Sequence, residues 1–329
     1  LDVFADCDSA EGNAPGHFRL SNVYAPFVKS SLDALDGVDV DDSATWRKHA
    51  RQSNRKMEVE RVELSPEHTD ILRPYQKDGV DWLRFLERNG FCGLLADEMG
   101  LGKTLQTLVW IQLERTNPEA RNKPTLIVCP TSLVHNWAEE SAKFAPALKV
   151  IPVSGSHRHE LWDDLPKADV IVTSYSLLRR DIERYEDLDF AAAVLDEAQH
   201  IKNRSTRNAL AAKKIQAHHK IVLTGTPVEN GVSDIWSIMD FLMPGYLGRH
   251  DAFRTVYELP IARGGPDAEL ALLKLRRKLH PFLLRRLKKD VAKELPPKIQ
   301  SVQSCELSPD QRAVYKELLE RSKRRIKDL

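Results

Sequence analysis

The chain has 329 residues, of which 42% are hydrophobic and 29% charged, so a folded globular protein is expected rather than a disordered one. Its formal net charge of +1 hides an uneven distribution, with nine acidic and four basic residues in 1–50 but seventeen basic and seven acidic residues in 274–329. A basic end of this kind favours an anionic partner such as nucleic acid, although a solvated helix face would carry the same charges.

No apolar stretch approaches the length of about eighteen residues that a membrane span needs, and the given sequence shows no signal-peptide h-region. Cys7, Cys92, Cys129 and Cys305 are too far apart to form the C-x-x-C pairs of zinc or redox sites. We therefore expect a soluble protein with reduced thiols and no membrane partner. Because the chain begins at Leu1 and not at a methionine, we also expect it to be a fragment.

Residues 1–65 are acidic and interrupted by glycine and proline, which indicates the remnant of an accessory region that is ordered only in part. Ser65 and Pro66 then form a helix start, with the serine as the cap and the proline in the first turn. Residues at helical spacing predict that the helix packs on one face: Tyr75, Gly79, Trp82, Leu83 and Leu86.

From Phe91 onward, short apolar runs alternate with amphipathic helices. The runs cover residues 91–95, 125–129, 149–153, 170–172, 191–195 and 220–223. This alternation predicts an α/β fold in which a mostly parallel sheet is covered on both sides. The turns at the carboxyl ends of the strands would then share one edge, where open α/β folds bind ligands. Helical segments follow at 234–242 and 270–279, and Ser308 begins a further helix with a capping box.

The first strand leads into a glycine loop that runs from Asp97 to Thr104 and ends in Gly102, Lys103 and Thr104. In a loop of this type the backbone N–H groups face phosphates, the lysine reaches the terminal phosphate oxygens, and the hydroxyl helps to hold Mg²⁺. The sequence therefore predicts a nucleoside triphosphate site. Asp97 is irregular, because the general pattern has its first glycine at that position.

Polar groups also follow the later strands. Asp196 and Glu197 end the apolar run 191–195, where one carboxylate can hold Mg²⁺ and the other can orient or deprotonate water, although an isolated acidic pair is usually surface decoration. Thr224 and Thr226 flank a glycine after the last strand. They form either a simple turn or a relay from the phosphate site to another surface.

The chain resembles, in order and spacing, the first-lobe motifs of the Swi/Snf ATPases of helicase superfamily two. The resemblance rests on LRPYQKDGVDWL, LADEMGLGKTLQT, LIVCPTSLVHNW, VIVTSYSLL, VLDEAQHIKN and LTGTPVEN, and continues through DIWSIMDFLMPGYLG and LLRRLKKDVAKELPPK. It covers about residues 66–305, and an aspartate at position 97 is usual in this family. The Asp-Glu-Ala-Gln form, followed by Ile-Lys-Asn, resembles bacterial members more than eukaryotic remodellers.

The resemblance implies a RecA-like three-layer fold with a helical extension. Residues 66–290 would form the first ATPase lobe, and 291–329 the linker and the start of a second lobe. It implies ATP and Mg²⁺ as cofactors and a location in the bacterial cytoplasm, associated with the nucleoid, or in a eukaryotic nucleus.

The resemblance also implies a role for individual residues. The catalytic residues would be Lys103, Asp196 and Glu197, and Thr104 and Asp196 would hold Mg²⁺. Nucleotide would be bound by Gln76 at the adenine edge and by Asp97, Glu98, Met99, Gly100, Leu101, Gly102, Lys103 and Thr104. Coupling to movement would involve Gln199, Thr224 and Thr226. The phosphates of a DNA duplex would face Pro130, Thr131, Ser132, Trp137, Thr173, Ser174 and Tyr175.

The function implied for the parent protein is DNA-dependent ATP hydrolysis that drives translocation on double-stranded DNA and remodels or displaces DNA-bound proteins. The second lobe would supply an arginine finger, so we expect this fragment to bind ATP weakly and turn it over little. Two alternatives stay open: a strand-separating helicase, and a nucleotide-gated DNA-binding module without turnover. The pairs Arg285-Arg286 and Lys288-Lys289 indicate either a solvated helix face or a hinge near DNA.

Overall fold

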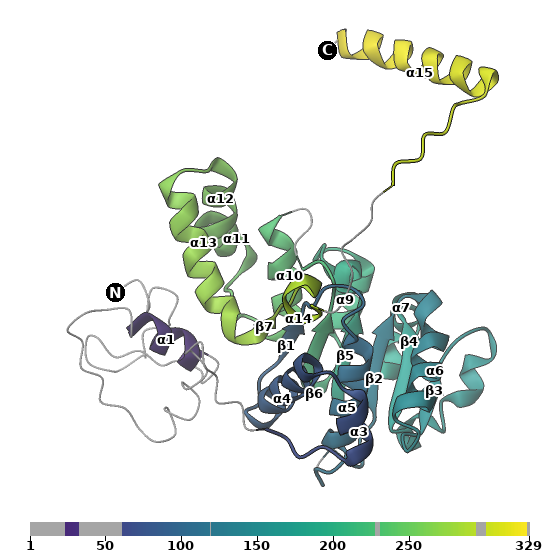
Figure 1. The fold of residues 1–329 in the computed structure, drawn as a ribbon, viewed down its shortest axis with the longest axis vertical. Helices are drawn as coiled ribbons and strands as arrows, with labels where there is room; N and C mark the ends of the chain where they lie inside the picture. Colours follow the sequence, from purple (N-terminus) through teal and green to yellow (C-terminus); the bar gives the residue numbers. More distant parts are fainter. Residues whose placement is uncertain (1–23, 33–60, 119, 228–230, 294–300, 328–329) are drawn as a thin grey trace. The chain divides into compact units, whose positions relative to one another are not determined.

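The computed structural model describes residues 24–32, 61–118, 120–227, 231–293 and 301–327. The chain divides into two compact units, residues 1–291 and residues 292–329. Most of the predicted accessory region, 1–65, lies outside the described residues. The first unit holds the sheet, and the second holds one long helix (Figure 1).

The first unit is built on a seven-stranded parallel sheet in the order β3-β4-β2-β5-β6-β1-β7. The strands are β1 (Gly93–Leu95), β2 (Thr125–Cys129), β3 (Val150–Pro152), β4 (Val170–Ser174), β5 (Phe190–Asp196), β6 (Ala217–Leu223) and β7 (Leu283–Leu284). Every residue of β1, β2, β4 and β5 is buried, which explains their unbroken apolar runs. The predicted α/β fold with a parallel sheet is confirmed.

Three strands differ most from the prediction. β6 begins at Ala217 and not at residue 220, because its pairing with β5 extends back to Phe190. β4 continues to Ser174, so Thr173 and Ser174 belong to the strand and not to the turn that follows it, because the pairing with β2 extends to Cys129 opposite Ser174. β7 was not predicted. Its two residues pair with Leu94 and Leu95 of β1, about 190 positions earlier in the chain.

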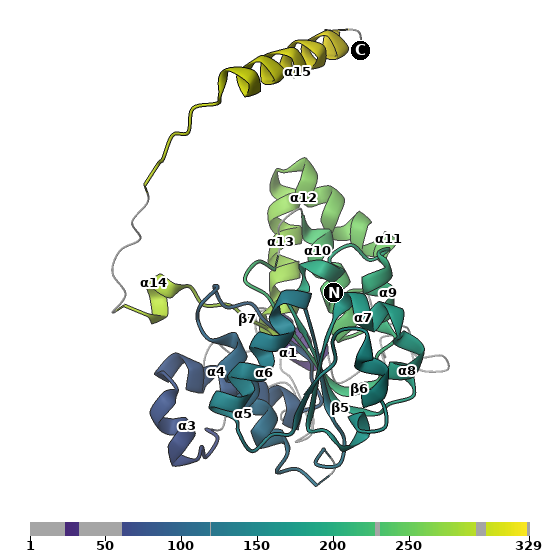
Figure 2. The same ribbon diagram turned by 90° about the vertical axis from the view of Figure 1, so that its right-hand side faces the viewer.

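Helices cover both faces of the sheet, as Figure 2 shows along the sheet edge. The helices are α1 (Ala25–Leu32), α3 (Pro66–Ile71), α4 (Pro74–Arg88), α5 (Lys103–Glu114), α6 (Val134–Phe144), α7 (Tyr175–Arg180), α8 (Ile182–Glu186), α9 (Arg207–Lys213), α10 (Val232–Leu242), α11 (His250–Phe253), α12 (Leu259–Arg263), α13 (Pro266–Leu279), α14 (Lys288–Val291) and α15 (Pro309–Lys327). One face carries α4, α5 and α6, and the other carries α7, α9 and α10. The sheet is therefore the middle of three layers, as the RecA-like fold requires.

The single helix predicted from Ser65 is in fact two. α3 ends at Ile71 and α4 begins at Pro74, because a residue that precedes proline is driven into the extended region and Arg73 adopts ψ of 156°. The hydroxyl of Ser65 bonds to Nδ1 of His68 at 2.8 Å and does not cap the helix backbone. The predicted capping box at Ser308 is confirmed, since Ser308 Oγ accepts from the N–H of Gln311 at 3.3 Å.

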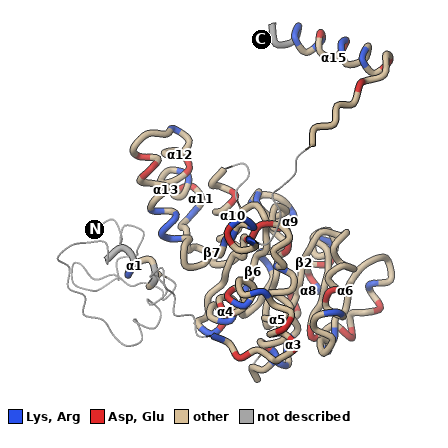
Figure 3. The backbone as a smooth tube through the Cα atoms, viewed as in Figure 1, with Lys and Arg blue, Asp and Glu red and all other residues tan. Residues whose placement is uncertain are grey.

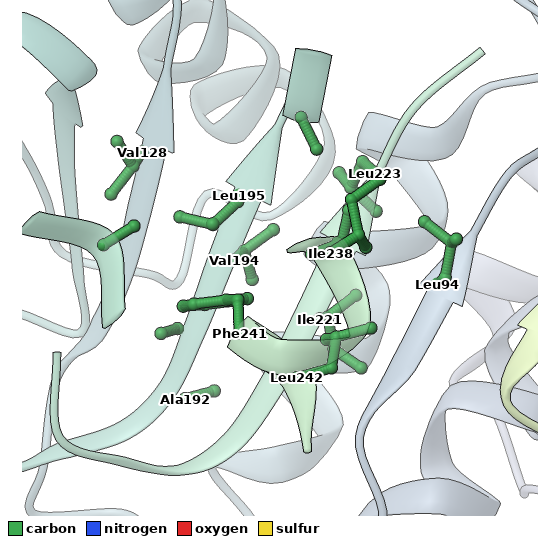
Figure 4. Close-up of a cluster of buried hydrophobic side chains, with 14 of the residues drawn as sticks. Leu94, Val128, Ala192, Val194, Leu195, Ile221, Leu223, Ile238, Phe241 and Leu242 are labelled. Atoms are coloured by element: carbon green, nitrogen blue, oxygen red, sulfur yellow. The ribbon is translucent and has the colours of Figure 1, made fainter. Parts of the chain in front are cut away.

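The core lies between the sheet and its helices. Figure 4 shows side chains of α10 packed onto the buried ends of the central strands. Ile238 and Phe241 are fully buried against residues of β5 and β6 such as Val194 and Ile221, which are at most 1% exposed. This packing fixes the strand ends beside which the polar turns lie.

The helices α10 to α13 form an extension beside the sheet, which agrees with the predicted helical extension. α1 packs against it: the ring of Tyr24 stacks on that of Tyr246 at 5.0 Å, and its hydroxyl donates to the Tyr246 carbonyl at 3.1 Å. Basic residues of the carboxyl-terminal region gather in the last turn of α13 and on α15 (Figure 3). Among the described helices, none has the length and apolar character to span a membrane.

Candidate functional site

The polar turns predicted to meet do lie at one edge of the sheet. Their strands β5, β6 and β1 are neighbours, and each turn follows the carboxyl end of its strand. The N–H of Thr224, after β6, donates to the carbonyl of Leu95 at the end of β1 at 3.2 Å. Gly225 lies so close to the glycine loop that a Cβ there would be 2.8 Å from Cγ of Met99. The loop and the Thr224–Thr226 turn are therefore in direct contact.

The glycine loop has the backbone form that phosphate binding needs. Gly100 and Gly102 have φ of 83° and 75°, which L side chains rarely adopt, and a Cβ at Gly102 would lie 2.3 Å from Nε2 of Gln76. Lys103 begins α5, so the first N–H groups of a twelve-residue helix follow the loop. Unpaired N–H groups and the helix dipole make such an end favourable for an anion.

Lys103 bends back onto the loop that precedes it. Its Nζ donates to the carbonyl of Asp97 at 2.8 Å. Burial lowers the pKa of Lys103, while the charges of Glu197, Asp196 and Asp97 act in the opposite direction. The ammonium thus lies within the field of both predicted catalytic carboxylates. Thr104, the second residue of α5, is half-buried beside it.

Gln76 contacts the loop from α4. Its Nε2 donates to the carbonyl of Leu101 at 3.2 Å, and its Oε1 accepts from the N–H of Arg73 at 2.9 Å. Asp97, the irregular position, has a fully buried side chain that accepts hydrogen bonds from Arg286. Glu98 accepts from the N–H of Lys288 at 2.7 Å. The loop is consequently held by side chains before and after it in the sequence.

Asp196 is 8% exposed at the end of β5. Its Oδ2 accepts from Nε1 of Trp137 at 2.9 Å, and its Oδ1 accepts from the N–H of Glu197 at 2.9 Å. Burial raises the pKa of Asp196 to about 6, against the lowering effect of the Trp137 hydrogen bond. Together with the Thr104 hydroxyl it supplies the oxygen ligands that Mg²⁺ prefers, so the donor set fits the predicted metal.

Glu197 has an unusual backbone. Among the described residues it is the only non-glycine residue with positive φ, at 51°. This left-handed conformation turns the chain from β5 into the short helix Ala198–Ile201. With its amide nitrogen turned toward Glu197, Gln199 donates to the Glu197 carbonyl at 3.2 Å and to its Oε2 at 3.0 Å. The predicted coupling residue therefore contacts the predicted base.

The turn after β6 is linked to the chain after β5. Thr224 is fully buried, and its Oγ1 accepts from the N–H of Thr226 at 3.2 Å. The carbonyl of Thr226 accepts from Nζ of Lys202 at 2.8 Å, and the same ammonium lies 4.0 Å from Asp234 of α10. A simple turn would not need this buried cation. The role of Thr224 and Thr226 as a relay stays a prediction.

Four of the residues predicted to face DNA are buried instead: Trp137, Thr173, Ser174 and Tyr175. Trp137 binds the Asp196 carboxylate, and the Tyr175 hydroxyl donates to the Asp196 carbonyl at 2.8 Å. Trp137 therefore braces the side chain of Asp196, and Tyr175 braces its backbone. On the surface are Thr131 and Ser132, with Pro130 half-buried before them. The predicted duplex contact therefore narrows to these three residues.

Three side chains that hold the site were not predicted: Gln106, Lys202 and Arg286. Gln106 and Lys202 stand within the blocks LADEMGLGKTLQT and VLDEAQHIKN, so their position next to the glycine loop and the acidic pair was the available signal. Arg286 stands within the block LLRRLKKDVAKELPPK, but nothing in the sequence placed that block next to the glycine loop. Its pairing with Asp97 depends on β7, which brings it beside the loop.

The profile of the SNF2-related domain family matches residues 75–328 of the chain. The chain belongs to this family. The matched range includes the glycine loop with Asp97, the acidic pair Asp196 and Glu197, and the Thr224–Thr226 turn. The first RecA-like lobe of such an ATPase accounts for the parallel sheet and for the arrangement of the strand-end turns.

SNF2-related proteins of several kinds are similar to this chain. It is 42% identical over 273 residues to the TATA-binding protein-associated factor MOT1 of Saccharomyces cerevisiae, which covers 77% of the chain and 15% of that protein. It is 39% identical over 326 residues to an uncharacterised ATP-dependent helicase of Mycoplasma pneumoniae, covering 98% of the chain and 30% of that protein. Relatives are thus both fungal and bacterial, and the closer likeness to bacterial members stays a prediction.

A solved SNF2 structure confirms the fold. The Sulfolobus solfataricus SWI2/SNF2 ATPase core in complex with double-stranded DNA superposes with a TM-score of 0.63 at 41% sequence identity. The match covers 78% of this chain and 54% of that one. The chain therefore spans about half of the solved core and less than a third of the two relatives named above.

A second group of ligand-type residues lies at the other end of the sheet. Within the described part of the chain, Glu87, Glu114 and His219 place three potential metal-ligand atoms within 4.8 Å of one another. Both carboxylate oxygens of Glu87, however, accept hydrogen bonds from Arg84, at 2.5 and 2.6 Å. The guanidinium opposes a further cation, so we assign no metal there. Burial, aided by the charge of Glu87, raises the pKa of Glu114 to about 8.

Proposed function

We propose that this chain is the nucleotide-binding first lobe of a DNA-dependent ATPase that translocates on double-stranded DNA and remodels or displaces DNA-bound proteins. The observation that carries the proposal is the meeting of the glycine loop, Asp196 with Glu197, and the Thr224–Thr226 turn at one edge of a SNF2-related sheet. None of these three groups alone would be specific for ATP hydrolysis.

The proposed chemistry assigns one task to each group. The loop N–H groups and Lys103 bind the phosphates of ATP, and Thr104 and Asp196 hold Mg²⁺. Bound Mg²⁺ supplies charge neutralisation at the transferring phosphoryl group. Glu197, which has a left-handed backbone, orients and deprotonates the attacking water. Gln199 contacts Glu197 and couples the presence or absence of the γ-phosphate to the surface that binds the second lobe and DNA.

DNA is proposed as the track, bound through its backbone. The support is the likeness to a solved core whose complex contains double-stranded DNA, together with the exposed Thr131 and Ser132. Contacts to phosphate suit a motor that must step along any sequence. We propose a DNA-bound protein as the cargo. The support is the similarity to a TATA-binding protein-associated factor, and it gives the class of cargo but not its identity.

A second RecA-like lobe is proposed as the partner that completes the site. An arginine from that lobe would stabilise the transition state, and such an arginine is worth about 10³ to 10⁵ in rate in related phosphoryl transfers. This chain matches only 54% of the solved core. We therefore propose that the chain alone binds ATP weakly and turns it over slowly. DNA-stimulated hydrolysis by the chain at the rate of the full-length protein would contradict this.

Glu197→Gln tests the proposed motor. In the full-length protein we expect the variant to bind ATP but to lose DNA-stimulated hydrolysis by about 10²-fold or more, because the base that takes the proton from water is absent. Phosphate release with and without duplex DNA measures it, and Glu183→Gln, an exposed glutamate on α8, is the matched control. A nucleotide-gated binding module would keep its biological activity in the Glu197→Gln variant.

The strand-separating alternative needs a separate experiment. A translocase displaces a bound protein or a third strand from duplex DNA without separating the two strands. We expect the full-length protein to release neither strand of a fluorescently labelled duplex while it hydrolyses ATP. Strand release that depends on ATP would favour the helicase.

A further inference from the structure

Arg286 lies beside the glycine loop, although it is 189 positions after Asp97 in the sequence. β7 pairs in parallel with β1, and the pairing continues past both strands: the N–H of Ala96 donates to the Leu284 carbonyl at 2.7 Å. The N–H of Glu98 then donates to the carbonyl of Arg286 at 3.0 Å. The chain that follows β7 therefore runs along the first half of the loop.

The side chain of Arg286 ties three elements together. Its Nε donates to Oδ1 of Asp97 at 2.9 Å, and its Nη2 donates to Oδ2 of Asp97 and, at 2.7 Å, to Oε1 of Gln106 on α5. Its Nη1 donates to the carbonyl of Tyr75 on α4, and the guanidinium lies 5.4 Å from the centre of the Tyr75 ring. This is the bidentate geometry that arginine provides and lysine does not.

The charge of this pair matters for the adjoining site. The Asp97 side chain is fully buried and that of Arg286 is 12% exposed. A buried carboxylate without a partner is strongly destabilising, and here it would also repel the phosphates of a bound nucleotide. With Arg286 in place the pair is neutral. The backbone carbonyl of Asp97 also accepts the hydrogen bond from Lys103 Nζ. Fixing the position of Asp97 therefore also fixes the position of the Lys103 ammonium.

The backbone after β7 is attached to the loop as well. The N–H of Arg286 donates to Oδ1 of Asp97 at 3.1 Å, and the N–H of Lys288 donates to Oε2 of Glu98 at 2.7 Å. The ammonium of Lys288 lies near Gly100, 3.2 Å from where a Cβ would be. Shortly afterwards, at Val291, the first compact unit ends.

We propose that Arg286 is a positioning residue that fixes the phosphate loop through Asp97 and Gln106, and that the chain leaving the sheet at β7 is thereby linked to nucleotide binding. This proposal rests on the proposed nucleotide site. It goes beyond the proposed function because it adds Arg286 to the residues that shape the site and connects the segment after β7 to nucleotide binding. Because its side chain is only 12% exposed, Arg286 does not lie on a solvated helix face, whereas the expectation of a hinge near DNA stays a prediction.

Affinity for nucleotide tests the positioning role. Binding of fluorescent N-methylanthraniloyl-ATP with Mg²⁺ is titrated on this chain at a temperature where circular dichroism shows every variant folded. We expect Arg286→Lys to weaken binding about tenfold and Arg286→Gln to weaken it more, since the second also leaves Asp97 unpaired. Arg285→Gln, at the exposed neighbouring position, should bind as the wild type does.

The double variant separates positioning from general damage. In Asp97→Asn with Arg286→Gln the buried charge is removed from both partners, so binding should recover by several-fold relative to Arg286→Gln alone. The proposal would be overturned if Asp97→Asn and Arg286→Gln lowered nucleotide affinity independently, so that their effects multiplied in the double variant. It would also be overturned if Arg286→Gln bound nucleotide with an affinity within twofold of the wild type. Wild-type chain that binds no nucleotide would instead overturn the proposed site, and the proposal with it.

Hydrogen exchange on the wild-type chain supplies a test that needs no variant. The amides of Arg286 and Lys288 are bonded to carboxylates of the loop, so binding of the same ATP analogue with Mg²⁺ should slow exchange in a peptide covering residues 284–291. The Arg286→Lys chain at saturating nucleotide should show a smaller slowing. Unchanged exchange in the wild-type peptide, with clear protection of residues 97–104, would contradict the link.

Discussion

At the scale of single residues, the site depends on conformations and contacts that cost free energy locally. The left-handed backbone of Glu197 costs about 1–2 kcal/mol in a residue with a Cβ. It persists because Asp196 Oδ1 accepts the N–H of Glu197 and because a short helix begins directly after it. Residues with such backbone strain are often found at active sites. The unusual φ and the proposed role of the base therefore point the same way.

The buried Glu114 gives the protein a pH dependence of stability far from the site. Its pKa is raised from 4.5 to about 8 on folding, so between these values the unfolded chain releases a proton that the folded chain keeps. Stability is therefore lost as pH rises from about 4.5 to about 8, by at most about 1.4 kcal/mol per pH unit. Glu114→Gln, which stays neutral, should be stabilised relative to the wild type at pH 8 but not at pH 4.5.

Urea unfolding of both proteins at the two pH values measures this difference. Glu139→Gln, at an exposed position on α6, serves as the control and should show no such change between the two pH values. An advantage of Glu114→Gln that is the same at both pH values would contradict the raised pKa.

At the scale of elements, α10 joins the helical extension to the sheet. Its apolar side chains cover β5 and β6, and Ser237 on the same helix donates to the carbonyl of Ile201 at 2.6 Å, next to the acidic pair. One helix thus packs the core and braces the chain after β5. Loss of packing on α10 should therefore lower the stability of the fold and also disturb the site.

Phe241→Ala tests that connection. Its side chain is fully buried, and truncation of such a phenylalanine costs about 3–5 kcal/mol through lost contacts and a cavity. We expect the midpoint of urea unfolding to fall accordingly. Leu210→Ala on α9, where the leucine is 53% exposed, should lose about 0.5 kcal/mol or less. Similar losses for both variants would show that α10 does not pack as described.

The sequence predicted those elements whose signal is local. Six strands are visible as apolar runs, and the turns after them contain the loop and the acidic pair. β7 could not be predicted, because Leu283 and Leu284 form a strand only through β1, far back in the chain. For the same reason Arg286 was assigned to a surface or a hinge. The bracing of Asp196 by Trp137 was missed because it joins residues 59 apart, and spacing alone could not distinguish it from a DNA contact.

At the scale of the whole molecule, the proposed function separates two surfaces. The proposed nucleotide site is formed by strand ends and buried charges, whereas the proposed DNA contacts, Thr131 and Ser132, are exposed on the short 3₁₀ helix Thr131–Leu133 after β2. The proposal has DNA bound through its phosphates, so stimulation of hydrolysis by DNA should depend on salt and not on base sequence.

Salt dependence provides the corresponding measurement. The DNA concentration that gives half-maximal ATPase stimulation of the full-length protein should rise steeply between about 50 and 200 mM salt, with a slope set by the number of phosphates neutralised. Duplexes of equal length but different base composition should give the same slope. Stimulation that differs several-fold between such duplexes, or does not change with salt, would contradict backbone binding.

The sheet ends in two short strands. β3 has three residues and finishes in Pro152, which has no N–H to offer, and β7 has only two residues. A long, flat outer strand is a template on which another chain can add by backbone pairing. Here the five longer or inner strands are shielded by short ones on either side. The fold thereby keeps a strongly apolar parallel sheet from becoming a seed for aggregation.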